Sequence, residues 1–182
     1  EPAAKVGVAA VVQIGLWALL LLTLPYSSWL SLVLKVVLFG IPAYLLSRFV
    51  SAADTRRALL LQRAPSAAWI GLSTAVLVSY ALFVDRGQAG LHSLSIFFVV
   101  SAVVVSPLVE EIMFRGVVLQ GLTRQLPFEL GNLLTSLLFL LYHVPAWMAR
   151  GQSISFLGCL WVVAVSIWLG YSLRRSRSLW TC

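Results

Sequence analysis

Charged residues are scarce in this chain, which has only six Asp and Glu and 13 Lys and Arg among its 182 residues. Charged side chains make up 10% of the sequence and hydrophobic ones 60%, whereas soluble domains are roughly a quarter charged and half apolar. The mean hydropathy of +0.97 reflects the same imbalance. These values exclude a soluble globular domain. We interpret the chain as an integral, multi-pass membrane protein with most of its surface facing lipid.

Cysteine and low-complexity sequence are also scarce. Cys159 lies in an apolar stretch and Cys182 ends the sequence, so their spacing supports neither a zinc knuckle nor a disulfide framework. No internal repeat or basic domain is present, although the sequence pI is near 10.1. We therefore expect a single transmembrane domain over residues 1–182, with membrane lipids rather than nucleic acid as partners of its positive charges.

Strand-like alternation is absent as well, whereas six apolar segments approach the roughly 20 residues that a helix needs to cross a bilayer. A backbone in lipid must satisfy its own hydrogen bonds, so we expect an all-α, polytopic transmembrane bundle with about six spans. The segments are 6–24, 29–49, 69–84, 94–123, 130–148 and 156–173. The first could instead be a signal peptide, but it is longer than the usual apolar core of one and its flank is hardly basic.

Lys and Arg collect on one side of these predicted spans, nine against two. Because translocation disfavours positive loops, the side with nine, and with it the N-terminus, is predicted to be cytoplasmic. The nine are Lys5, Arg48, Arg56, Arg57, Arg63, Arg124, Arg174, Arg175 and Arg177, and the two are Arg86 and Arg150. Lys35 lies within a span, and we expect it to extend toward the membrane interface.

Two acidic residues and an arginine stand inside the fourth apolar segment, in the run SPLVEEIMFRG at 106–116. A charge buried in lipid is costly unless it is paired or used, so this run is where we look for chemistry. Residues four apart share a helix face, whereas neighbours point about 100° apart. We therefore expect Glu111 to pair with Arg115 and Glu110 to face a water-filled cavity. A purely structural clamp is the alternative, but a clamp needs only one acid.

His143 is the ionisable residue of the next apolar segment. Glu111 lies 12 residues before Thr123 and His143 lies 13 residues after Leu130, which places each about 18 to 20 Å from the turn that joins the two helices. The acid pair and the imidazole are thus predicted to lie at matching depth. A carboxylate and a neutral imidazole that converge on one water would form a general-base pair.

The two motifs together, Glu-Glu-x-x-x-Arg at 110–115 and Phe-x-x-x-His at 139–143, resemble the CAAX protease and bacteriocin-processing enzyme family, also called Abi. Pro107 before the acids, Gly170-Tyr171 and the Ser-Leu-Trp at 178–180 are also similar to that family. The resemblance covers about 101–180, within a motif-bearing core over about 94–180. Either motif alone would be weak, whereas the two in order are fairly specific.

This resemblance implies a glutamate-type intramembrane peptidase that needs neither metal nor cofactor and acts on a membrane-bound protein or peptide. Eukaryotic members remove the C-terminal tripeptide of prenylated CAAX proteins, and bacterial members are often linked to bacteriocin processing or immunity. By motif position, Glu110 and His143 would be catalytic and activate water. Glu111 and Arg115 would support the site, and Phe139 would pack beside the histidine.

A later His-x-x-x-Asn helix, which is held to stabilise the oxyanion, usually follows in that family. Loss of a placed oxyanion donor costs about 10² to 10³ in rate. We expect that helix either to continue the protein beyond Cys182 or to have been lost. In the second case the chain is a catalytically incomplete family member that acts as an accessory or immunity subunit of a membrane complex.

Zinc chemistry is a competing interpretation, because Glu110, Glu111 and His143 could supply two or three ligands. It is disfavoured because the His-Glu-x-x-His signature is absent and Arg115 would repel a dication. His92 is predicted to lie on the far-side loop. A transporter is not supported, since neither repeats nor paired broken helices are evident.

Overall fold

The structure, a computed structural model, describes residues 2–23, 29–43 and 105–179 together with the isolated positions 45, 67, 68, 71, 75 and 100. These residues are helical apart from short turns and contain no strand, so the predicted all-α class is confirmed. The elements are α1 (Pro2–Thr23), α2 (Trp29–Lys35), the π-helical η1 (Val36–Gly40), α7 (Ser106–Glu111), the π-helical η4 (Ile112–Leu119), α8 (Gln120–Leu122), α9 (Phe128–Ala149) and α10 (Phe156–Ser176).

Three described helices are long and apolar enough to cross a membrane, namely Ala4–Thr23, Phe128–Ala149 and Phe156–Ser176. They correspond to the first, fifth and sixth predicted spans. The second predicted span is a shorter apolar helix, Trp29–Ala43, and the described part of the fourth is helical from Val105 to Leu122. The third, 69–84, lies outside the described residues except for positions 71 and 75.

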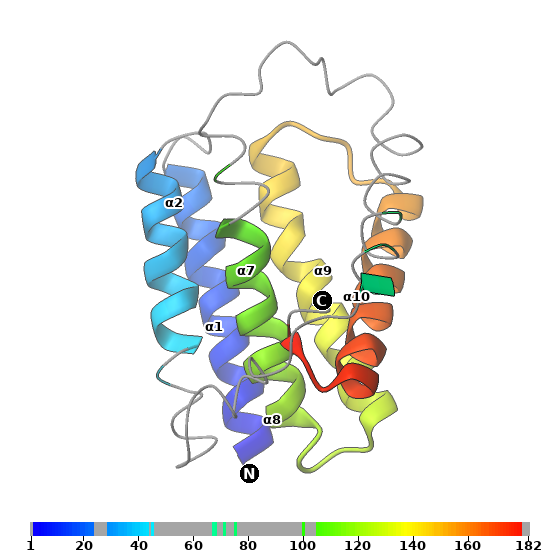
Figure 1. Ribbon diagram of the computed structural model, residues 1–182. Coiled ribbons are helices and arrows are strands. Elements are labelled where there is room, and N and C mark those ends of the chain that lie inside the picture. Colours follow the sequence, from blue (N-terminus) through cyan, green and yellow to red (C-terminus); the bar gives the residue numbers. More distant parts are fainter. Residues whose placement is uncertain are drawn as a thin grey trace.

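The helices lie side by side as a bundle (Figure 1). In that view α1 and α9 run upward, whereas α2, the α7–η4–α8 helix and α10 run downward. The start of α1, the turn between α8 and α9, and the end of α10 therefore share one end of the bundle. Pro127 at the N-cap of α9 ends the turn, because proline fits the start of a helix but not its interior.

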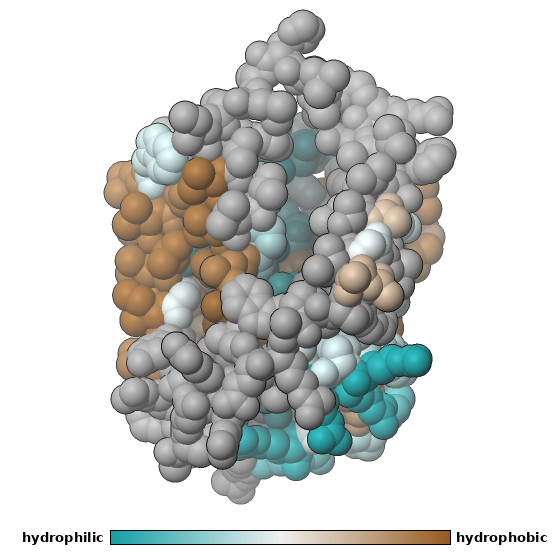
Figure 2. Space-filling view, viewed as in Figure 1, coloured by the Kyte–Doolittle hydropathy of each residue, from teal (hydrophilic) through white to brown (hydrophobic). Residues whose placement is uncertain are grey.

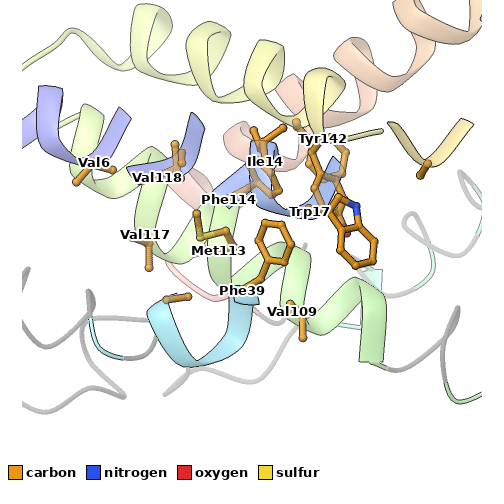
Figure 3. Packing of buried hydrophobic residues seen from close by; sticks show 14 of the residues in the cluster. Val6, Ile14, Trp17, Phe39, Val109, Met113, Phe114, Val117, Val118 and Tyr142 are labelled. Carbon is orange, nitrogen blue, oxygen red and sulfur yellow. The ribbon is translucent and has the colours of Figure 1, made fainter. Parts of the chain in front are cut away.

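Hydrophobic side chains fill the centre, where α1, η1, α7, η4 and α9 meet (Figure 3). Val6, Trp17, Phe39, Phe114 and Tyr142 are among the residues that pack there. Because α1 supplies a buried stripe to this core, it is an integral part of the bundle.

Large apolar side chains also lie on the outside, as expected for a protein surrounded by lipid. Leu22 is 77% exposed and Phe156 is 83% exposed. Figure 2 shows hydrophobic surface over α1 and α2, while hydrophilic surface gathers at the end where the α8–α9 turn and the end of α10 lie.

Candidate active site

Glu110 is joined to α2 by a buried ion pair. Its Oε1 atom lies 2.7 Å from Nζ of Lys35, and the two side chains are 18% and 6% exposed, respectively. The expectation that Lys35 extends toward the membrane interface is therefore wrong. The lysine points into the bundle because the carboxylate of α7 compensates its charge there, which open hydrocarbon would not do.

Tyr142 from α9 is the second donor to the same carboxylate oxygen. Its hydroxyl donates to Oε1 of Glu110 over 3.2 Å, and its ring is buried. Glu110 thus ties together α2, α7 and α9. Phe114, four residues after Glu110, packs on Tyr142 with ring centroids 5.5 Å apart, so Glu110 and Phe114 lie on the same helix face.

Glu111 and Arg115 form the predicted pair on a different helix face. Oε1 of Glu111 lies 3.2 Å from Nη1 of Arg115, whose side chain is 1% exposed. Nη2 of Arg115 donates to Oγ of Ser166 on α10 over 2.9 Å, and the guanidinium carbon lies 4.4 Å from the ring centroid of Phe139. The arginine is therefore a buried junction between the glutamate helix, α9 and α10.

His143 is oriented by a hydrogen bond within its own helix. Its Nδ1 atom lies 2.8 Å from the carbonyl oxygen of Phe139. A carbonyl oxygen can only accept, so Nδ1 carries the hydrogen, and in the neutral imidazole Nε2 then presents a lone pair. The imidazole lies against the rings of Phe139, Tyr142 and Trp147, at centroid distances of 4.5, 5.3 and 6.0 Å.

Aromatic rings enclose the ion pair and hold its members in place. Trp17 and Phe39 both pack on Tyr142, at 6.0 and 5.2 Å between centroids, and Figure 3 shows these three side chains close together. Nζ of Lys35 lies 5.7 Å from the Trp17 ring centroid and 5.4 Å from that of Tyr142. Such ring faces attract a cation and partly replace its water.

Both charged helices change from α- to π-helical geometry next to the site. η1 begins directly after Lys35, and η4 begins directly after Glu111. Pro107 lies in the first turn of α7, where its missing N–H matters least. Such widened π-helical turns are rare in proteins overall but are frequent at functional sites. Here each of them follows a charged residue of the site.

The structure thus places four of the five predicted site residues in two adjoining groups, Glu111 with Arg115 and Glu110 with His143. The fifth predicted residue, Phe139, joins the two groups. Phe139 contacts Arg115 and His143, and its neighbour Tyr142 contacts Glu110 and His143. Sequence reasoning missed Lys35, Tyr142 and Ser166. The sequence did contain a signal for Lys35. It is a basic residue inside a predicted span, and Glu110 in another predicted span had no predicted cationic partner.

Among the described residues no group of three or more His, Cys, Asp or Glu is placed to hold a metal ion. His92 lies outside the described residues. The two motif acids have cationic neighbours, Lys35 at Glu110 and Arg115 at Glu111.

Comparison with protein families adds a match that spans both motifs. Residues 92–182, half of the chain, match the model described as type II CAAX prenyl endopeptidase Rce1-like. The chain belongs to this family. The Rce1-like assignment confirms the resemblance inferred from the paired glutamates and the histidine, and makes the chain a member of an intramembrane peptidase family. Searches of curated proteins and of solved structures found no match.

Proposed function

We propose that this Rce1-like chain is an intramembrane endopeptidase in which Glu110 and His143 together activate a water molecule. The observation that carries the proposal is the meeting of α7 and α9 at Tyr142. The Tyr142 hydroxyl contacts the Glu110 carboxylate, and its ring lies against the His143 imidazole. A carboxylate and an imidazole lone pair at one depth can each accept one hydrogen of a bound water.

Glu110 is the group that takes the proton. Among the described residues both of its contacts fall on Oε1, which leaves Oε2 to accept from water. As the water oxygen bonds to the peptide carbon, one O–H bond breaks, its proton passes to Glu110, and the carbonyl π electrons move to the carbonyl oxygen. Collapse re-forms the carbonyl and breaks the C–N bond, and Glu110 returns the proton to the leaving amine.

His143 orients the water without taking its proton. The hydrogen bond from Nδ1 to the Phe139 carbonyl leaves Nε2 as an acceptor, so the imidazole holds the second hydrogen of the water. This fixes the water lone pair toward the substrate carbonyl.

Glu111, Arg115 and Phe139 support the site. Arg115 binds Glu111 and Ser166 and lies over the Phe139 ring, and Phe139 in turn supplies the carbonyl that orients His143. Loss of Arg115 would leave the largely buried Glu111 without its cation. The resulting loss of activity would follow from a disturbed structure rather than from the loss of a catalytic group.

The substrate is a peptide bond that reaches the interior of the bundle from a membrane-bound protein or peptide. The family description supports a prenylated C-terminal segment, and a bacteriocin-type leader peptide is the second substrate class. Neither the proposed chemistry nor the residues that carry it require a cofactor, because the carboxylate and the imidazole together handle both water hydrogens.

The test is peptide release by purified protein in proteoliposomes, with a prenylated CAAX peptide and a leader peptide as separate substrates. Glu110→Gln keeps the shape but cannot take the proton, so we expect a loss of about 10² to 10⁴ in kcat, and His143→Ala to lose activity too. Glu129→Gln is the matched control, since Glu129 is an exposed acid paired with Arg174 and surface pairs contribute about 0 to 1 kcal/mol. Unchanged release by Glu110→Gln would refute the proposal.

A second candidate function is that of an accessory or immunity subunit of a membrane complex. It is favoured by the way Arg115 joins Glu111 on the glutamate helix to Ser166 on α10, as in a structural clamp. Large apolar side chains exposed along α9, such as Leu133, Leu137 and Leu141, could dock a partner helix. Stoichiometric co-purification with another membrane protein, and no peptide release, would support it.

A further inference from the structure

Lys35 is a buried charge that the water-activating pair does not use. It is the last residue of α2, in an apolar helix, and its side chain is 6% exposed. A buried ammonium is costly unless it is compensated. The described groups that compensate it are the Glu110 carboxylate and the faces of Trp17 and Tyr142.

We propose that Lys35 is a third catalytic residue, whose fixed ammonium stabilises the negative charge first on Glu110 and then on the tetrahedral oxyanion. This inference rests on the proposed function, since it assigns Lys35 to the same reaction. It follows from where the charge travels. In the resting site the negative charge is on Glu110, 2.7 Å from Nζ.

Attack by water moves the negative charge from Glu110 to the substrate oxygen, and the net charge of the site does not change. The water O–H bond breaks and its proton neutralises Glu110, while the carbonyl π electrons make the substrate oxygen negative. Lys35 neither gains nor loses a proton. Its ammonium, which has further N–H donors besides the one directed at Glu110, then faces a neutral carboxyl and a nearby anion. A fixed cation in a water-poor site stabilises such a developing charge strongly.

The surroundings hold the ammonium in place for this role. Lys35 lies at the junction of α2 and η1, and Phe39 of η1 packs on both Trp17 and Tyr142. The same two rings lie near Nζ. Because packed rings hold the Lys35 ammonium in place, the ammonium does not move when the proton of the water moves to Glu110. The site therefore needs no reorganisation of this charge as the reaction proceeds.

The charged and titratable groups around Glu110 come from each described element that surrounds it. Lys35 comes from α2, Tyr142 and His143 from α9, and Glu111 with Arg115 from its own helix. Of these, Lys35 alone is a cation in contact with the Glu110 carboxylate. Replacing it therefore removes the compensating charge and leaves the proposed base and its partner in place.

The experiment compares Lys35→Met and Lys35→Arg with the wild-type protein in the peptide-release assay. Lys35→Met matches the length of the side chain without the charge, and we expect kcat to fall about 10² to 10³ fold with KM changed less than about threefold. Lys35→Arg keeps the charge and should recover at least about a tenth of the wild-type kcat. Lys5→Met, at an exposed lysine of α1, is the matched control and should leave both constants unchanged.

Thermal unfolding of Lys35→Met, Glu110→Gln and the double variant in detergent tests the ion pair independently of activity. We expect Lys35→Met to lower the unfolding temperature and the double variant to recover most of the loss, because no uncompensated charge remains buried. If the double variant recovers nothing, the pair is not coupled and the proposal is overturned.

The kinetic outcomes separate the two proposals. If Glu110→Gln abolishes release while Lys35→Met leaves kcat unchanged, the proposed function stands and the role of Lys35 is wrong. If Lys35→Arg is as inactive as Lys35→Met, or if KM rises as much as kcat falls, Lys35 is structural and the inference is overturned. If the wild-type protein releases no peptide from either substrate, the proposed function fails and the catalytic role of Lys35 fails with it.

Discussion

Glu110 and Glu111 are neighbours in sequence yet have different cations, and this difference separates their roles. Glu111 pairs with Arg115 on its own helix, a local contact that four-residue spacing produces. Glu110 pairs with Lys35, 75 residues earlier, and with Tyr142, 32 residues later. The first acid is therefore held by tertiary contacts and the second by local ones.

Tyr142→Phe removes one donor to Oε1 of Glu110 and keeps the ring that packs on Trp17 and Phe39. We expect the free energy of unfolding to fall by about 1 to 3 kcal/mol and kcat to fall roughly tenfold, since a hydrogen bond to a charged group is lost. Tyr171→Phe, at an exposed tyrosine of α10, is the control. Chemical unfolding in detergent and the release assay measure both. Equal effects at the two tyrosines would contradict the prediction.

At the scale of elements, α9 and α10 approach closely through small and polar residues. Gly170 of α10 faces Asn132 of α9, whose amide donates to the Ile167 carbonyl over 3.0 Å. Ser166, one turn earlier, accepts from Arg115. Small residues let helix backbones approach in a membrane, where no hydrophobic force drives helices together. The same contact between α9 and α10 thus fixes the helix pair and the arginine that supports the site.

Gly170→Ala should force α9 and α10 apart. A Cβ atom at position 170 would collide with the Asn132 side chain, so we expect a loss of about 1 to 3 kcal/mol in the free energy of unfolding. Gly15→Ala is the matched control, because a Cβ there meets nothing within 4 Å and alanine raises helix propensity by about 1 kcal/mol. Unfolding temperatures in detergent compare the two, and a Gly170→Ala variant as stable as the wild type would show that the contact is not tight.

At the scale of the whole molecule, the described basic residues agree with the predicted charge asymmetry. Lys5 in the first turns of α1, Arg124 in the α8–α9 turn, and Arg174 and Arg175 in the last turn of α10 lie toward one end of the bundle, and Arg150 lies at the other (Figure 1). We propose that the end with the α8–α9 turn is cytoplasmic and contacts anionic lipid headgroups.

Cysteine labelling tests this orientation. In a background with Cys159 and Cys182 replaced by serine, Arg124→Cys should react with an impermeant maleimide only from the cytoplasmic side, and Ser153→Cys only from the opposite side. Both positions are exposed, and positive loops are retained on the cytoplasmic side. Labelling of Arg124→Cys only from outside would reverse the topology, and labelling of both from one side would show that α9 does not span.

The sequence by itself determined the membrane class, the three long spans and the Glu111–Arg115 pair. Each depends on composition or on contacts within a helical turn, which residue spacing alone sets. Only the tertiary structure decided the partners of Glu110, the inward direction of Lys35 and the contact of Arg115 with Ser166. These join residues 32 to 75 positions apart. Spacing along the chain cannot specify such contacts, because they depend on how separate helices are rotated and seated against one another.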